Sequence, residues 1–339
     1  MTRELVSVVM PAHNAARWVE QAVTSMLVQT HRELEVIVVD DASTDRTPDI
    51  VSAFRDSRVR LVQKMHNGGC GRALNTGLEH AQGVIIARLD ADDYALPQRL
   101  ERQVQMLARA PDIGVLDAAA WRVDASGRSL GRSPRFEGRA LHYQLLQECP
   151  IVHPAVVMRK SVLPRDGYPS VDTQMEDYAL WLELAPQVRL EHLPEPLIVY
   201  RRHPGAIGAQ RTGLRSQAEW ARIMARQLGL AIDTQVAAAW LHPSHVGHVS
   251  ESCVAQLVSL VRRLDPETFT FGAHVPAWTP LGRARASRLY AHRVVRLVLA
   301  ARAGGRRDVV AALVGDAAKL SARAIALTLR VSRRGSRRG

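Results

Sequence analysis

The N-terminal half of this 339-residue chain contains three short, mostly apolar runs, and polar side chains follow each of them. The runs are Val6–Met10, Leu34–Val39 and Val84–Leu89; the stops are Pro11 to Asn14, Asp40-Asp41 and Asp90-Ala91-Asp92-Asp93. Apolar runs of this length are typical of strands buried on both faces of a parallel sheet. Because the carboxyl ends of parallel strands meet at one edge, we expect these polar groups to line a ligand site there.

Stretches with helical spacing separate the apolar runs. We expect helices over residues 14–29, from Ser43-Thr44-Asp45 to about Phe54, and over residues 71–81 and 174–185. This alternation predicts an α/β fold with a Rossmann-like, mostly parallel sheet and helices on both of its faces. From about residue 210 onward the pattern is almost wholly helical, and His203-Pro204-Gly205 marks the boundary. The sequence thus predicts a main domain at 1–205, a helical basic accessory region at 206–331 and a disordered tail at 332–339.

The positive charge is concentrated in the C-terminal segment. The chain has a formal charge of +12, and residues 283–339 alone hold 14 Arg and one Lys against two Asp. Residues 284–338 interleave Arg with apolar side chains, so we expect helices that lie on an anionic membrane surface. Helices packed on the main domain and an oligomer interface are the alternatives. Nucleic-acid binding is not expected, because the body is neutral and no known nucleic-acid-binding motif is present.

Cysteine content and the N-terminus indicate a cellular compartment. Cys70, Cys149 and Cys253 are far apart and form no CxxC pair, which argues against a disulfide framework or a cysteine zinc site and favours a reducing cytosol. The first residues read as a strand rather than a signal peptide, and no window of about 18 residues is free of charge. The expected location is cytoplasmic, peripheral on the inner face of the cytoplasmic membrane.

The acidic turn Asp90-Ala91-Asp92-Asp93 is the most specific single feature. Mn²⁺ and Mg²⁺ prefer oxygen ligands and often bind one or two carboxylates together with phosphate oxygens. Closely spaced aspartates at the end of a buried strand supply such ligands. The alternative is a solvated turn whose aspartates cap the next helix.

Three further stretches carry candidate site residues. Asp40 and Asp41 could accept hydrogen bonds from a base or a ribose, or the polar stretch could cap a helix through Asp41 or Ser43. The glycine-rich Asn67-Gly68-Gly69-Cys70-Gly71-Arg72 allows close backbone approach to a phosphate or base, although a plain turn fits it equally well. Glu176-Asp177 begins a predicted helix and could supply a general base. Alternatively, the two negative charges could simply stabilise the helix through its dipole.

Taken together, these motifs resemble the family-2 inverting glycosyltransferases, which have the GT-A fold. The resemblance rests on motifs in matching order and spacing over about 200 residues: Val8 to Asn14, Val39 to Asp45, Asn67-Gly68-Gly69 with Arg72, Asn75-Thr76-Gly77, Leu89 to Asp93, Pro97, Arg99-Leu100, His153-Pro154-Ala155, Glu176-Asp177 with Leu180-Trp181, and Tyr200 to His203. After His203 no shared motif can be placed, so the last third is interpreted from its residues alone.

The resemblance implies a role for each candidate residue, with 1–205 as the GT-A catalytic domain for donor and acceptor. Asp177 would be the general base and Glu176 would support the acceptor site. Asp93, with Asp92 and Asp90, would bind Mn²⁺ or Mg²⁺, and Asp92 would also approach the ribose. The nucleotide would contact Pro11, Ala12, Asn14, Asp40, Asp41, Asn67 and Arg72. His153, Arg201 and His203 would lie near the diphosphate or the acceptor.

The activity that follows is transfer of a sugar, with inversion, from a nucleotide-sugar donor to a hydroxyl acceptor. The family favours a UDP-linked donor and a glycan or lipid-linked acceptor, in cell-surface polysaccharide or glycolipid synthesis. A catalytically inactive, glycosyltransferase-like binding protein is one alternative, and the presence of Asp93 and Asp177 argues against it. A sugar nucleotidyltransferase is another, but Pro11 to Asn14 lacks the long glycine-rich loop ending in Arg and Lys expected there.

Overall fold

The computed structural model describes residues 4–133, 139–145, 149–169, 175–206, 232–241, 248–264 and 280–313. The chain forms two compact units. Unit 1 comprises residues 1–136 and 150–211, and unit 2 comprises residues 137–149 and 212–339. The domain limits expected at residues 205 and 331 remain predictions, since residues 207–231 and 314–339 lie outside the described part of the chain.

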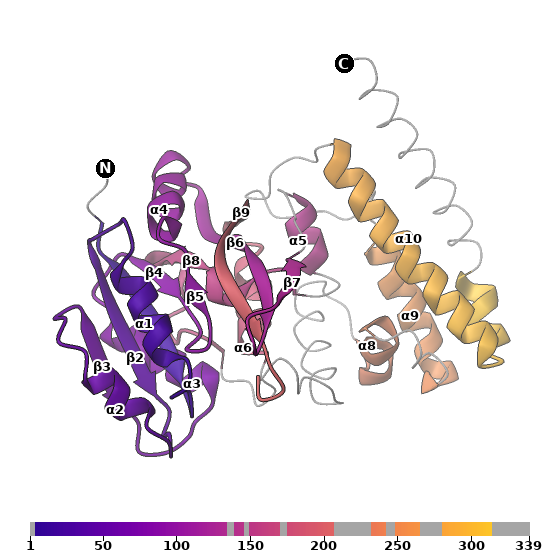
Figure 1. The fold of residues 1–339 in the computed structure, drawn as a ribbon. Coiled ribbons are helices and arrows are strands. Elements are labelled where there is room, and N and C mark those ends of the chain that lie inside the picture. The colour runs from indigo at the N-terminus through magenta and orange to yellow at the C-terminus, as the bar shows by residue number, and fades with distance from the viewer. Residues whose placement is uncertain are drawn as a thin grey trace. The chain divides into compact units, whose positions relative to one another are not determined.

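Unit 1 is organised around one sheet, whose strands run in colour from indigo (β1) to salmon pink (β9) in Figure 1. Among the described residues the strand order is β3-β2-β1-β4-β8-β6-β9-β5, with β7 paired to β6. β1, β2, β3 and β4 run parallel, whereas β8 runs antiparallel to both β4 and β6. The strands are β1 (Val6–Ala12), β2 (Leu34–Asp40), β3 (Val59–Gln63), β4 (Ile85–Arg88), β5 (Tyr94–Ala95), β6 (Ile113–Asp124), β7 (Ser129–Arg132), β8 (Val157–Arg159) and β9 (Arg189–Arg202).

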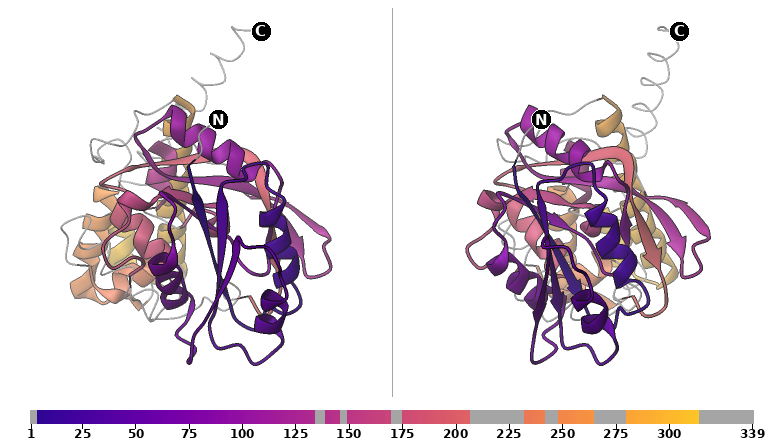
Figure 2. Two further views of the ribbon diagram at one scale, coloured as in Figure 1. Left: turned by 90° about the vertical axis from the view of Figure 1, so that its left-hand side faces the viewer. Right: turned by 60° about the vertical axis from the view of Figure 1, so that its left-hand side comes forward.

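Helices cover both faces of the parallel strands, which confirms the α/β fold expected from the sequence (Figure 2). The helices of unit 1 are α1 (Val19–Leu27), α2 (Thr47–Ser52), α3 (Cys70–His80), α4 (Arg99–Arg109) and α6 (Glu176–Leu184), with 3₁₀ turns η1 (His153–Ala155) and η2 (Lys160–Val162). Val8 and Met10 pack into one core with residues of α1 and α4. On the other face α3 approaches so closely that a Cβ on Gly77 would lie 2.4 Å from the Val9 side chain.

The expected helices differ from the structure at their ends, and two of the differences bear on the site. The helix expected over residues 14–29 is shorter and begins at Val19, because Ala15 to Trp18 form a turn. The helix expected from residue 174 begins at Glu176, and residue 174 itself lies outside the described residues. As a result, Asn14 lies in the loop that joins β1 to α1, where its side chain can serve the site rather than a helix surface.

Unit 2 contains α5 (Arg139–Leu145), α8 (Thr234–Leu241), α9 (Glu251–Arg263) and α10 (Pro280–Ala303). The Tyr143 hydroxyl donates to the Leu264 carbonyl over 2.6 Å, and the Tyr290 hydroxyl of α10 donates to the Val261 carbonyl. No helix among the described residues is both long enough and apolar enough to cross a membrane. The part of the expected basic helices beyond residue 313, and the tail expected at 332–339, lie outside the described residues.

Candidate active site

The loops after β1 and β2 are joined at the carboxyl edge of the sheet through Asn14. The Asn14 side-chain oxygen accepts a hydrogen bond from the Thr44 backbone amide over 2.9 Å. The Asn14 backbone amide donates to the Ser43 hydroxyl, also over 2.9 Å. Asn14 has a left-handed backbone with a φ of 51°, a conformation that asparagine tolerates better than most residues. Pro11 and Ala12 end β1 in the same place, so these predicted nucleotide-binding residues lie together.

Asp41 fastens the glycine-rich loop to the end of β2. Its carboxylate, which is buried, pairs with the Lys64 ammonium at 2.5 Å and accepts from the amides of Gly68 and Gly69 at 2.9 Å and 2.8 Å. Gly69 has a φ of 83°, where a glycine is favoured. Asn67 and Arg72 of the predicted nucleotide site are exposed on either side of this junction.

Neither Asp41 nor Ser43 caps α2, so the capping alternative is wrong for these two residues. Asp45 is the residue that bonds the Thr47 amide, over 2.9 Å, at the first residue of α2. Burial acts to raise the pKa of Asp45, but the hydrogen bonds from Thr47 outweigh it and lower the pKa. Asp40 has one oxygen bonded to the Ser43 amide, whereas its Oδ1 is buried and has no partner among the described residues.

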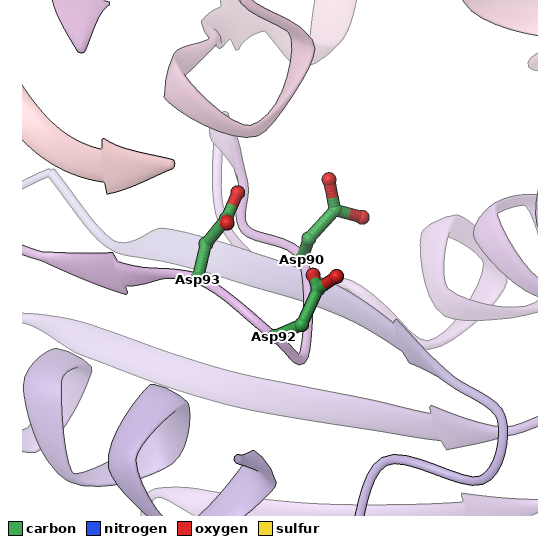
Figure 3. Close-up of side chains that lie close together, drawn as sticks. All are labelled: Asp90, Asp92 and Asp93. Carbon is green, nitrogen blue, oxygen red and sulfur yellow. The ribbon is translucent and has the colours of Figure 1, made fainter. Parts of the chain in front are cut away.

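The acidic turn after β4 brings three carboxylates together. Oxygen atoms of Asp90, Asp92 and Asp93 lie within 4.8 Å of one another, and the three side chains point the same way (Figure 3). Burial, followed by the charges of Asp90 and Asp92, raises the pKa of Asp93 well above its usual range. Burial and the charge of Asp90 also raise the pKa of Asp92. The turn therefore concentrates negative charge in a poorly hydrated place.

The end of β9 packs against this acidic turn. The Arg201 amide donates to Asp93 Oδ1 over 2.7 Å, and the Arg201 guanidinium donates to the Asp92 carbonyl over 2.9 Å. His203 Nε2 lies 2.8 Å from Asp92 Oδ2. Trp18 stacks on the His203 ring, with centroids 4.4 Å apart, and lies beneath the Arg201 guanidinium. Two residues predicted to serve the diphosphate or the acceptor thus contact the predicted metal ligands directly.

Glu176 and Asp177, which are both buried, occupy the first turn of α6. Asp177 Oδ2 lies 3.8 Å from His153 Nδ1, and the other ring nitrogen of His153 lies 2.9 Å from the Tyr168 hydroxyl. Asn75 holds Tyr168 in place by bonding its backbone at both the amide and the carbonyl. The predicted base, its neighbour and His153 therefore form one cluster.

Several residues of the site carried no assignment from the sequence. Lys64, Trp18 and Tyr168 belong to no motif, and their roles depend on contacts with distant parts of the chain. Arg88 did give a signal, since it is a charged residue inside an apolar run and directly before the acidic turn. Arg99, within a motif of the resemblance, is fully buried and donates to the carbonyls of Arg88 and Val156, so it braces the end of β4.

The acidic turn has the properties expected of a site for a hard divalent cation. Asp93 Oδ2 is buried without a hydrogen-bond partner among the described residues, although carboxylate oxygens in proteins are normally satisfied. Burial and neighbouring carboxylate charges raise the pKa values of Asp92 and Asp93, and a cation that binds oxygen would relieve both conditions. The residues present thus fit Mn²⁺ or Mg²⁺.

Comparison with known proteins places the chain in a family. The model of the glycosyl transferase family 2 matches residues 7–166. The Escherichia coli protein WfgD, named UDP-Glc:alpha-D-GlcNAc-diphosphoundecaprenol beta-1,3-glucosyltransferase, is 32% identical over 182 residues, which are 53% of this chain and 69% of WfgD. The match with an uncharacterized glycosyltransferase of Rickettsia felis, 31% identical over 183 residues (53% of this chain), covers only 30% of that longer protein.

Solved structures share the fold. The crystal structure of S. aureus TarS 1-349 in complex with UDP-GlcNAc has a TM-score of 0.59 at 19% identity, covering 90% of this chain and 89% of that one. The mannosyltransferase PcManGT of Pyrobaculum calidifontis, in complex with GDP-Man and Mn2+, has a TM-score of 0.52 at 21% identity, covering 94% and 88%. These likenesses confirm the expected GT-A-type fold. With the sequence matches to its relatives, they establish that the chain belongs to glycosyltransferase family 2.

Proposed function

We propose that this glycosyltransferase moves a sugar from a UDP-linked donor to a hydroxyl group of a lipid-linked glycan, with inversion at the anomeric carbon. The observation that carries the proposal is the acidic turn, where a buried Asp93 oxygen without a partner lies among crowded carboxylates. The names of WfgD and of the TarS complex support a UDP-sugar donor, and that of WfgD supports a diphosphate-lipid acceptor.

In this proposal Asp93, Asp92 and Asp90 hold Mn²⁺ or Mg²⁺. The bound ion would neutralise the negative charge that develops on the diphosphate as the sugar leaves. The chain's own contribution is to fix these carboxylates, and Arg201 does so by bonding both Asp92 and Asp93. His203, at 2.8 Å from Asp92, and the exposed Arg72 supply further polar groups for the diphosphate.

The nucleotide would lie against the joined loops that follow β1 and β2. Pro11, Ala12 and Asn14 offer backbone and amide groups, and Asp40 has a free buried oxygen for the base or the ribose. Asp41 already has three hydrogen-bond donors, so its part is to hold the loop of Asn67 in position rather than to lose those bonds to a ligand.

Asp177 would act as the general base that takes the proton from the acceptor hydroxyl. His153 lies close to Asp177 Oδ2, and Tyr168 holds the other side of the His153 ring, so the carboxylate has an oriented environment. Glu176, one residue before it, would bind the acceptor. A single base on the face opposite the leaving group gives direct displacement, and hence inversion.

Residues 206–331 would serve as an accessory region that brings the enzyme to an anionic membrane surface. Within the described part of α10, His292, Arg296, Leu299 and Arg302 are exposed and recur at helical spacing. A basic stripe with an exposed leucine suits lipid headgroups, and each nearby Arg adds about 1 kcal/mol of attraction. Flotation with vesicles tests this directly: we expect the chain to float with anionic vesicles, whereas recovery only in the soluble fraction at moderate salt contradicts it.

A donor screen tests the central proposal. Thermal unfolding with each nucleotide sugar and Mn²⁺ should single out one donor, since a ligand at 100 times its Kd adds about 2.7 kcal/mol of stability. Donor hydrolysis with Mn²⁺ separates an active enzyme from an inactive binding protein. Pyrophosphate release from a nucleoside triphosphate and a sugar phosphate would indicate the nucleotidyltransferase instead.

A further inference from the structure

Arg88 is a buried cation at the end of β4, directly before the acidic turn. It is 2% exposed, and its guanidinium forms an ion pair with Asp90 at 2.6 Å. The other arm of the guanidinium donates to the Cys70 sulfur over 3.7 Å. Burial alone would lower the pKa of Arg88, but the charge of Asp90 raises it. Arg88 therefore connects the acidic turn to the first residue of α3.

Cys70 continues this connection to the helix that carries the predicted base. Burial raises the pKa of the Cys70 thiol well above its usual range, and the charge of the nearby Glu176 carboxylate raises it further, so the proton stays on sulfur. Gly71 lies against the same side chain, since a Cβ on Gly71 would lie 3.1 Å from the Glu176 Cβ. The start of α3 and the start of α6 are thus in contact beside the sulfur.

A second route closes the network through Tyr168. The charges of Arg88, Asp177 and Glu176 all act on the Tyr168 hydroxyl, whose pKa is raised by burial. That hydroxyl contacts His153, which in turn lies near Asp177. Arg88, which pairs with Asp90, and the two carboxylates of α6 therefore act on the same hydroxyl.

The partners of Arg88 differ from those of a buried arginine that only supports the fold. Arg159, on the adjacent strand β8, donates to the backbone carbonyls of Ile113 and Leu107. Among the described residues, the Arg88 hydrogen bonds go instead to the side chains of Asp90 and Cys70. Burying a cation costs several kcal/mol, and an apolar residue would continue β4 without that cost. The site, rather than the strand, explains the charge.

We propose that Arg88 is a positioning residue for sugar transfer, which through Cys70 fixes Glu176 and Asp177 relative to the acidic turn. The inference rests on the proposed function, because it assigns Asp177 to the acceptor and the acidic turn to the donor diphosphate. Transfer in line requires the two to keep a fixed separation, and a displacement of about 1 Å can cost about 10²-fold in rate. Arg88 bonds Asp90 of the acidic turn and Cys70 of α3, and the next residue, Gly71, lies against the Glu176 side chain.

The test compares kcat, donor KM and Mn²⁺ binding in Arg88→Met, Cys70→Ala and the double variant. Loss of an outer supporting group typically costs about 10- to 100-fold in activity, so we expect Arg88→Met to lower kcat by that factor. Donor KM should stay within about threefold and the stabilisation by Mn²⁺ alone should persist, because Asp92 and Asp93 are unchanged. Cys70→Ala should lower kcat in part, and the double variant should be no worse than Arg88→Met alone.

Two further variants keep the test independent of folding. Arg88→Lys retains the charge next to Asp90 and should recover part of kcat. Arg159→Met removes an arginine of the neighbouring strand and should lower the thermal midpoint while leaving kcat unchanged. Wild-type kcat in Cys70→Ala, or independent effects of the two substitutions, would overturn the inference. If the wild-type chain transfers no sugar, the proposed function fails, and that result is distinct from a variant with unchanged kcat.

Discussion

Two acidic turns lie at the same edge of the sheet, after β2 and after β4, and they are built in opposite ways. In the first, Asp41 pairs with Lys64 and accepts from the amides of Gly68 and Gly69. In the second, Asp93 has one bonded oxygen and one buried oxygen for which the described part of the chain offers no partner, next to two more carboxylates. The Asp41 carboxylate of the first turn is thus fully bonded within the folded chain, whereas the carboxylates of the second turn would gain from an added cation.

This contrast indicates that the two turns have different roles. A carboxylate that is fully hydrogen-bonded stabilises the fold and positions its loop, but has little capacity left for a ligand. Crowded, poorly hydrated carboxylates repel one another and store unfavourable energy that a divalent ion releases on binding. We infer that the β2 turn shapes the nucleotide side and that the β4 turn supplies the ion-binding side.

The largest expected effect is that of Asp93→Asn on turnover. The substitution removes a buried carboxylate charge of the predicted ion site, one oxygen of which has no hydrogen-bond partner among the described residues, so the stabilisation by Mn²⁺ should disappear. A metal ion supplies several kcal/mol of charge stabilisation, and kcat should fall by about 10³-fold. Asp49→Asn, on the exposed surface of α2, is the matched control and should change neither quantity. If Asp93→Asn binds Mn²⁺ as well as wild type does, Asp93 is not needed for ion binding, and the proposed difference between the two turns is wrong.

Asp177→Asn sharpens the comparison by separating proton transfer from ion binding. General-base catalysis contributes about 10²- to 10⁴-fold, so kcat should fall by at least about 10²-fold. Stabilisation by Mn²⁺ and by the donor should remain, since the acidic turn is intact. Glu183→Gln changes an exposed carboxylate on the same helix and should behave as wild type. Near-normal turnover in Asp177→Asn would remove this residue from the role of base.

Asp41→Asn should affect stability more than catalysis. It breaks a buried ion pair and weakens two amide hydrogen bonds, and bonds to charged groups are worth about 1.5–3 kcal/mol. We expect a loss of about 2 kcal/mol in the free energy of unfolding, measured by urea denaturation. The partly exposed pair of Asp56 with Arg58 offers a control, and Asp56→Asn should cost less than Asp41→Asn, at most about 1 kcal/mol, because solvent screens this pair. An equal loss in both variants would mean that Asp41 is not the fastening point.

The smallest expected effect concerns how the free energy of unfolding depends on pH. For Asp93 this dependence should have the opposite sign to that of most aspartates. In the folded chain the pKa of Asp93 lies above the usual 3.8, so the folded state binds its proton more tightly than the unfolded chain. Without metal, wild type should therefore lose stability relative to Asp93→Asn as the pH rises from about 4 towards neutrality. Added Mn²⁺ should cancel this loss of stability. If the difference in stability between wild type and Asp93→Asn does not change with pH, the raised pKa of Asp93 is contradicted.

The sequence predicted both acidic turns, but not which of them has its carboxylate hydrogen-bonded within the chain. Apolar runs ending in aspartates predicted the strands, the edge and the site residues, because burial and strand ends are encoded locally. That Asp41 is satisfied while Asp93 is not depends on Lys64, Gly68 and Arg201, which reach these carboxylates only through the fold. Local patterns contain no information on such partners.

The strand β9 shows a second limit of prediction from sequence. Pro194 and Pro196 lie within it and cannot donate to a sheet, so its sequence argues against a strand. The structure accommodates them with irregular register against Ala118, Ala119 and Ala120 of β6. After these irregularities, Arg201 near the end of β9 and His203 just beyond it lie at the acidic turn. Only the pairing of strands that are distant in the sequence determines this placement.

The most direct test measures release of nucleoside diphosphate from a panel of donor sugars, with Mn²⁺ and with a chelator. The account predicts turnover of one donor with Mn²⁺, loss of that turnover when the ion is chelated, and recovery when Mn²⁺ is restored. Equal turnover in the presence of the chelator, or no release from any donor at saturating Mn²⁺, would contradict it.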